Sequence, residues 1–181
     1  MILVLAACGK DATPPPPSRV EGAKTTAPKA VDTAGFCDAH FAGDSGPALV
    51  VPPLAKGGAL APAKGWRWLN IWATWCKPCV EELPRIARWR AKLPPLEFSL
   101  VSVDEDDAAI EAFRQAHPGT PESARLATPD KQTDWFKQLG LDAGSPIPIH
   151  VFVAPSGHVR CARAGGVREQ DFAAIERLLS E

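Results

Sequence analysis

Two cysteines separated by two residues, in the stretch "WCKPC", are the residues with the most chemistry to offer: Cys76 and Cys79. Such a pair can bind a metal ion, form a structural disulfide or exchange electrons. A zinc site commonly needs four ligands, but there is no second C-x-x-C, and His40 and His117 lie in other segments without zinc-finger spacing. A structural disulfide closing so short a loop removes little entropy from the unfolded chain. Redox chemistry is the remaining interpretation.

The flanking residues place this pair where a strand passes into a helix. Residues 66–73, "WRWLNIWA", are mostly apolar, as in a central strand covered on both faces. Apolar residues at helical spacing then predict a helix from near Cys76 to Leu93. A helix N-terminus favours a thiolate, Lys77 adds a positive charge, and Pro78 fits the first turn. The position therefore supports a reactive cysteine.

The rest of the sequence alternates strand and helix patterns. It predicts strands over 48–51, 96–103 and 124–130, helices over 104–117 and 131–140, a hairpin over 149–163 that turns at 155–157, and a terminal helix over 168–181. Strand–helix–strand units followed by a hairpin and a helix predict an α/β sandwich.

The first 35 residues are different in kind. Residues 1–8 are apolar and end in Leu-Ala-Ala-Cys, which resembles part of a bacterial lipoprotein signal with Cys8 as the lipidated residue. Residues 9–35 are rich in Pro and Ala and lack aromatic residues before the folded domain, so we expect a disordered tether there and a folded domain over 36–181. The alternatives are an apolar N-terminus with an idle cysteine and a tether that packs partly on the domain. Lipid on Cys8 would place the protein in the periplasm or another extracytoplasmic space, anchored to a membrane.

Two segments resemble a known family. Residues 68–84, "WLNIWATWCKPCVEELP", are similar to the signature of the TlpA/ResA group of membrane-anchored, thioredoxin-like thiol–disulfide oxidoreductases, and residues 145–159 resemble the family's proline loop and the strand after it. The resemblance implies a thioredoxin-like α/β fold, with a central mixed sheet flanked by helices and an inserted helix–strand element. It implies no cofactor beyond the redox-active disulfide. Ile149 and His150 replace a usual pair of threonines, and Ala154 replaces a usual aspartate.

The resemblance also implies roles at the cysteine pair. Cys76 would be the exposed nucleophile, and the more buried Cys79 would resolve the mixed disulfide. Pro148 would be the cis-proline that presents free backbone groups to a substrate, although a plain loop proline, or Pro146 in the cis role, is an alternative. The substrate groove would be formed by Trp75, Lys77, Pro78 and Ile147.

Glu82 lies three residues after Cys79 and so shares its helix face. The resemblance implies a buried acid that moves protons at the cysteine pair, since burial in an apolar pocket raises the pKa of a carboxyl group. The alternative is a solvated glutamate like Glu81. Asn70 occupies the strand position at which cytosolic thioredoxins carry a buried aspartate, which makes Glu82 more important as a base.

Cys37 and Cys161 are the two cysteines left over. In an oxidising compartment we expect a structural disulfide between them. The loop that it closes is long, so the chain-entropy estimate of its stabilisation is about 4–5 kcal/mol. A metal contact through Cys37 and His40 is the alternative.

The predicted function is a tethered thiol–disulfide oxidoreductase that reduces specific partner proteins, with cytochrome c maturation or copper-site assembly as settings that the resemblance implies. Its partners would be extracytoplasmic proteins with cysteines and a membrane electron donor of the thiol–disulfide type. The net charge of −1 and the absence of a basic run argue against nucleic acid, and we expect a monomer. The alternatives are a Cu(I) carrier, with His150 and His158 near Pro148, and a docking module without redox chemistry.

Overall fold

A computed structural model of the chain describes residues 31–56 and 59–181. The predicted signal segment, Cys8 and the tether up to residue 30 lie outside the described residues, so those assignments stay predictions. Within the described ranges, no helix has the length and apolar character needed to cross a bilayer.

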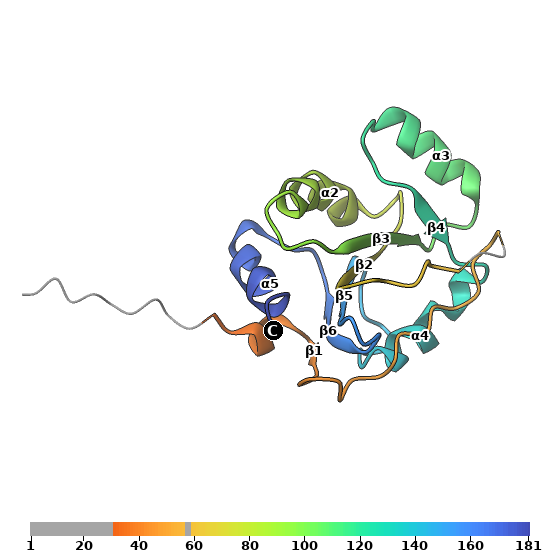
Figure 1. Cartoon of the computed structure of the whole chain (residues 1–181). Coiled ribbons are helices and arrows are strands. Elements are labelled where there is room, and N and C mark those ends of the chain that lie inside the picture. The colour runs from red at the N-terminus through yellow and green to blue at the C-terminus, as the bar shows by residue number, and fades with distance from the viewer. Residues whose placement is uncertain (1–30, 57–58) are drawn as a thin grey trace, which may run out of the picture. The chain divides into compact units, whose positions relative to one another are not determined.

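Six strands form one mixed sheet in the order β1-β6-β5-β2-β3-β4 (Figure 1). Strands β2, β3 and β4 run parallel, whereas β5, β6 and β1 are joined by antiparallel pairings, with β5 antiparallel to β2. The elements in chain order are α1 (Thr33–Phe36), β1 (Ala39–His40), β2 (Arg67–Trp72), α2 (Lys77–Arg90), β3 (Glu97–Ser102), α3 (Asp107–Ala116), β4 (Ser123–Arg125), η1 (Pro129–Lys131), α4 (Gln132–Gln138), β5 (Ile149–Val153), β6 (Val159–Ala164), η2 (Glu169–Asp171) and α5 (Phe172–Leu178).

Strand β2 is the centre of the core, and all six of its residues are buried. Successive side chains of a strand point to opposite faces, so Trp68 and Asn70 share one face and Leu69 the other. Trp68 packs in an apolar cluster with residues of α2 and α5, while Leu69 packs with residues of α4. Figure 1 shows the same division, with α2 and α5 on one side of the sheet and α4 on the other. The predicted α/β sandwich is confirmed.

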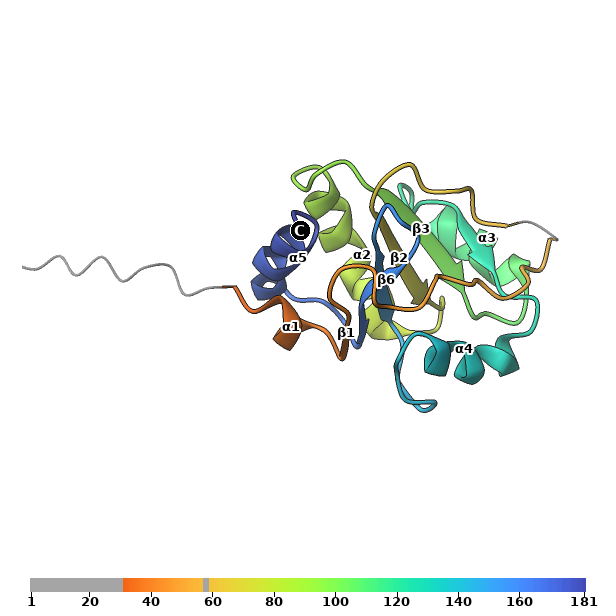
Figure 2. The same cartoon turned by 60° about the horizontal axis from the view of Figure 1, so that its bottom comes forward.

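This topology brings two distant segments to one end of the sheet. Strand β2 runs out at Trp72 just before α2 begins, and its antiparallel neighbour β5 starts at the same level, with Ile71 opposite Ile149. The start of α2 and the loop that enters β5 are therefore neighbours, although about 70 residues separate them (Figure 2). The cysteine pair lies in the first of these segments and Pro148 in the second.

Several predicted details differ from the structure. The strand predicted over 124–130 is shortened to β4, and η1 begins at Pro129. Residues 48–51 form no strand; only Ala48 makes an isolated bridge, with His158. Prolines at 47, 52 and 53 lack the N–H groups that a longer ladder needs, so the pairing cannot extend. At the other end, α1 begins at Thr33, three residues before the predicted start of the domain at Phe36. It forms there because Asp32 caps its first turn and Phe36 is buried against Phe152.

Candidate active site

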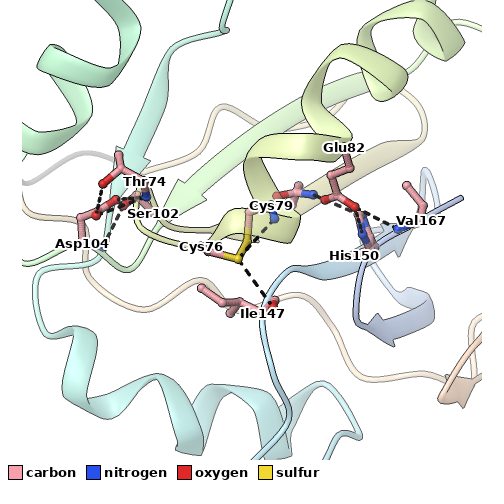
Figure 3. The surroundings of a disulfide bond; sticks show 10 residues. Thr74, Cys76, Cys79, Glu82, Ser102, Asp104, Ile147, His150 and Val167 are labelled. Atoms are coloured by element: carbon pink, nitrogen blue, oxygen red, sulfur yellow. Dashed lines mark hydrogen bonds and ion pairs between the residues drawn. A yellow bond between two sulfur atoms is a disulfide. The ribbon is translucent and has the colours of Figure 1, made fainter. Parts of the chain in front are cut away.

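The Cys76–Cys79 disulfide lies at the first turn of α2, with its sulfur atoms 2.04 Å apart (Figure 3). Cys76 is the N-cap residue, and its Sγ accepts the backbone N–H of Cys79 at 3.3 Å. The positive end of the helix dipole and this N–H group would both stabilise a thiolate on Cys76 after reduction. Lys77 contributes less, because its exposed ammonium group lies 3.7 Å from the carboxylate of Glu81.

The two sulfur-bearing residues differ in accessibility. Cys76 is 5% exposed and Cys79 is fully buried. The expectation of an exposed Cys76 is therefore wrong for the disulfide form, in which this residue is almost completely buried. Trp75, by contrast, is 68% exposed, and Lys77 and Pro78 are exposed beside it. Exposed side chains therefore surround a cysteine pair that is itself nearly buried.

The peptide bond between Ile147 and Pro148 is cis, whereas the bond before Pro146 is not. Cys76 Sγ lies 3.7 Å from the carbonyl oxygen of Ile147. In the disulfide this sulfur carries no proton, so the approach is a contact and not a hydrogen bond. It places half-buried Ile147 directly beside the sulfur that a partner would attack, and the carbonyl of Pro148 is held by the N–H of Gly165 at 2.8 Å.

Glu82 is buried, with 2% of its surface exposed, and it projects from α2 on the Cys79 side of the helix (Figure 3). Its Oε1 accepts a hydrogen bond from Asn70 Nδ2 at 2.8 Å, and its Oε2 accepts the backbone N–H of Val167 at 2.9 Å. Gly166 makes room for this, since a Cβ there would come within 3.3 Å of Oε2. The structure thus places Glu82 and Asn70 together, one turn beyond the disulfide.

His150 completes this cluster. In the sequence it stood out only as a departure from the family pattern and as a residue of the copper-carrier alternative. It is fully buried on β5, directly opposite Asn70 on β2. Trp68 Nε1 donates to its Nδ1 at 3.1 Å, and its Nε2 lies 3.3 Å from Glu82 Oε2. The one available signal was alternation along β5, which puts His150 on the face toward α2.

A second buried carboxylate lies on the opposite side of the disulfide (Figure 3). Asp104, 2% exposed, follows β3 and accepts the N–H of Thr74 at 3.0 Å, the hydroxyl of Thr74 at 2.7 Å and the hydroxyl of Ser102 at 2.6 Å. These bonds fix the turn that carries Cys76. No spacing in the sequence marked Asp104, which was included only as the first residue of the helix predicted over 104–117.

Comparisons with known proteins agree with this geometry. The chain is 30% identical over 109 residues to a thiol:disulfide interchange protein DsbE homolog of Paracoccus denitrificans, covering 60% of this chain and 55% of that protein. It is 33% identical over 96 residues to the thiol-disulfide oxidoreductase ResA of Bacillus subtilis, covering 51% and 49%. The chain is thus similar to ResA and DsbE thiol–disulfide oxidoreductases. It spans about half the length of these curated relatives, and no family model matches it.

Solved structures show the same fold. The thioredoxin domain of a thiol-disulfide oxidoreductase from Bacteroides vulgatus superposes with a TM-score of 0.57 at 16% identity, covering 77% of this chain and 99% of that one. A thiol:disulfide interchange protein of the thioredoxin family from Chlorobium tepidum gives 0.55 at 20% identity, covering 78% and 97%. The chain has a thioredoxin fold.

A second disulfide joins Cys37, just after α1, to Cys161 in β6. The two residues are 124 positions apart in sequence. Cys161 is fully buried and Cys37 partly so, and the adjacent β1 pairs with β6 through Ala39 and Ala162. The bond ties the N-terminal entry of the domain to the sheet, well separated in sequence from the Cys76 pair.

Across residues 31–56 and 59–181, no three or more His, Cys, Asp or Glu side chains are grouped so that they could hold a metal ion. His150, which the copper-carrier alternative uses, has its Nδ1 engaged by Trp68 and its Nε2 beside Glu82.

Away from the site, a hydrogen bond from the buried Arg67 guanidinium, 2.7 Å from Glu97, holds the pKa of that carboxyl below its ordinary value.

Proposed function

We propose that the chain is an extracytoplasmic thiol–disulfide oxidoreductase, tethered through lipid on Cys8, that reduces disulfides of specific partner proteins. The observation that carries the proposal is the Cys76–Cys79 disulfide at the start of α2, with Cys76 Sγ beside the carbonyl of Ile147 and the cis-proline after it. The kinship with ResA and DsbE proteins supports the same reaction class.

The reaction runs from the dithiol form of the pair. The Cys76 thiolate attacks one sulfur of the partner's disulfide, which forms a mixed disulfide and releases the other partner sulfur as a thiolate that takes up a proton. Cys79 then gives its proton to the carboxylate of Glu82 and attacks Cys76 Sγ. The second partner sulfur leaves as a thiol after taking up a proton, so the partner gains two electrons and the Cys76–Cys79 disulfide is restored.

The exposed residues around Cys76 would receive the partner. Trp75, Lys77 and Pro78 supply a projecting surface, and Ile147 supplies backbone groups beside the sulfur, where an extended segment could pair. In this role the pair has to be reduced again after each turnover by a membrane electron donor of the thiol–disulfide type. Cytochrome c maturation or copper-site assembly is the setting that we propose.

The reaction class is tested with the purified chain, reduced and freed of reductant, acting on insulin disulfides. The wild-type chain should reduce insulin, Cys76→Ser should not, and Cys79→Ser should accumulate a mixed disulfide that dithiothreitol releases. A wild-type rate no higher than that of Cys76→Ser would refute the proposal.

The direction of electron flow is tested by the reduction potential of the Cys76–Cys79 pair, measured by equilibration with dithiothreitol or glutathione. A value near that of thioredoxin, about −270 mV, supports a reductase, whereas a value near that of DsbA, about −120 mV, would make the chain a disulfide donor. Mass spectrometry of the partner trapped by Cys79→Ser in cells then identifies the substrate protein.

A further inference from the structure

The buried carboxylate of Glu82 does not stand alone, because His150 faces it from the neighbouring strand. His150 Nε2 lies 3.3 Å from Glu82 Oε2, and both side chains are almost fully enclosed, with 0% and 2% of their surface exposed. This pair is absent from the family pattern described above, in which threonine is usual at this position. What we infer from this pair extends the proposed function and rests on it.

The position of the proton on His150 follows from Trp68. An indole N–H can only donate, and it donates to His150 Nδ1 at 3.1 Å, so Nδ1 must carry a lone pair. Asn70 Nδ2, 3.3 Å from the same nitrogen, is a second donor on that side. The ring is therefore neutral, with its proton on Nε2, the nitrogen that faces Glu82.

Within the described residues His150 Nε2 has no hydrogen-bond partner, although Glu82 Oε2 lies only 3.3 Å away. A buried donor without a partner is destabilising, so its presence at this site calls for an explanation. Catalytic hydrogen bonds are often long or misaligned at rest and shorten during the reaction. The acceptor within reach of the His150 Nε2–H group is Oε2 of Glu82 in its carboxylate form.

Once the Nε2–H group bonds to Oε2, the two oxygens of Glu82 differ in their free capacity to accept a proton. Oε2 already accepts the N–H of Val167 and faces the Nε2–H of His150, whereas Oε1 accepts only from Asn70. A carboxylate oxygen has two lone pairs, so Oε1 keeps one free.

We propose that His150 is a positioning residue for Glu82: its Nε2–H, fixed on that nitrogen by Trp68, favours the carboxylate form of Glu82 and leaves Oε1 to take the proton of Cys79. Other charged groups lie near this pair. Arg163 on β6 is directly opposite His150 on β5, and Asp171 of η2 lies 3.9 Å from Arg163. Because these two have opposite charges and neither contacts Glu82, His150 is the donor that acts on the carboxylate.

The test compares His150→Leu, which removes the donor, with His150→Gln, whose amide can accept from Trp68 and donate to Glu82. The side-chain carboxyl of Glu82, labelled with ¹³C and assigned by loss of its signal in Glu82→Gln, is titrated by NMR in the disulfide form. Its midpoint should lie at a higher pH in His150→Leu than in the wild type, and His150→Gln should restore it. Equal midpoints in the wild type and His150→Leu would overturn the proposal.

The second readout is the rate at which Cys79 resolves a mixed disulfide, measured by stopped flow between pH 5 and 9. A lost hydrogen bond to a charged group should slow His150→Leu about tenfold below neutral pH, with its profile displaced to higher pH. In a Glu82→Gln background the same change should have no further effect. An equal additional loss there would show that His150 acts independently of Glu82. A shifted NMR midpoint in a chain that reduces no disulfide would keep the His150–Glu82 contact and reject the proposed function instead.

Discussion

Replacing Asp104 tests whether this buried carboxylate holds the turn that carries Cys76. Asp104→Ala removes the acceptor of the Thr74 N–H, the Thr74 hydroxyl and the Ser102 hydroxyl, at 3.0, 2.7 and 2.6 Å. The hydroxyl groups can turn toward other acceptors, but the backbone N–H cannot. Since one buried donor without a partner costs roughly 1–3 kcal/mol and three bonds to a charged group are lost, we expect a loss of about 3 kcal/mol in the free energy of unfolding.

Asp104→Asn keeps the shape and one acceptor oxygen, so its loss should be smaller, about 1 kcal/mol, as bonds to a charged group become bonds to a neutral one. Glu105→Ala is the matched control, because this neighbouring side chain is exposed, and it should stay within about 0.5 kcal/mol of the wild type. The assay is urea unfolding at neutral pH with both disulfides intact, followed by tryptophan fluorescence.

Insulin reduction, measured on the same proteins where they remain folded, should fall in the order Glu105→Ala, Asp104→Asn, Asp104→Ala. The last two should be affected because Thr74 is two residues from Cys76. A free energy of unfolding for Asp104→Ala within about 0.5 kcal/mol of the wild type would refute the idea that Asp104 fixes this turn.

Three further outcomes are expected. Replacing Cys37 and Cys161 together by alanine should lower the free energy of unfolding by about 2–5 kcal/mol, because the unfolded chain is no longer restricted by a disulfide between residues 124 positions apart. An unchanged urea midpoint would contradict this. Trp75→Ala should leave stability within about 0.5 kcal/mol but raise the KM for a protein disulfide, and an unchanged KM would exclude Trp75 from docking. Because Arg67 lowers the pKa of Glu97, that carboxylate stabilises the fold above its unfolded-state pKa, and the contribution is lost as the pH falls through the folded-state pKa. The stability difference between the wild type and Glu97→Gln should therefore shrink in acid, and a constant difference from neutral pH to pH 3 would count against it.

The sequence predicted the elements whose pattern is local. The apolar run over 66–73 became β2, and the turn residues 155–157 separate β5 from β6, because burial and turn chemistry act over a few residues. The segment over 48–51 was assigned wrongly, since its apolar content suggested a strand while the surrounding prolines prevented the pairing.

The site was predictable in the same uneven way. The spacing of Cys76, Cys79 and Glu82 lies within one helix and could be recognised directly. His150 and Asp104 could not be placed, because their partners are set by strand register and chain crossing: His150 meets Asn70 across two antiparallel strands, and Asp104 meets Thr74 from the next parallel strand. Contacts of this kind depend on the tertiary arrangement and leave no spacing signal in the sequence.

The order of the sheet has a consequence for partner choice. Its two outer strands are β1, of two residues, and β4, of three, so neither outer strand by itself offers much unpaired backbone to another chain. Short margins of this kind protect proteins against accidental strand pairing. A partner segment in extended conformation would find few free backbone N–H and C=O groups on these two strands. The backbone of Ile147, in contrast, lies beside the Cys76–Cys79 disulfide.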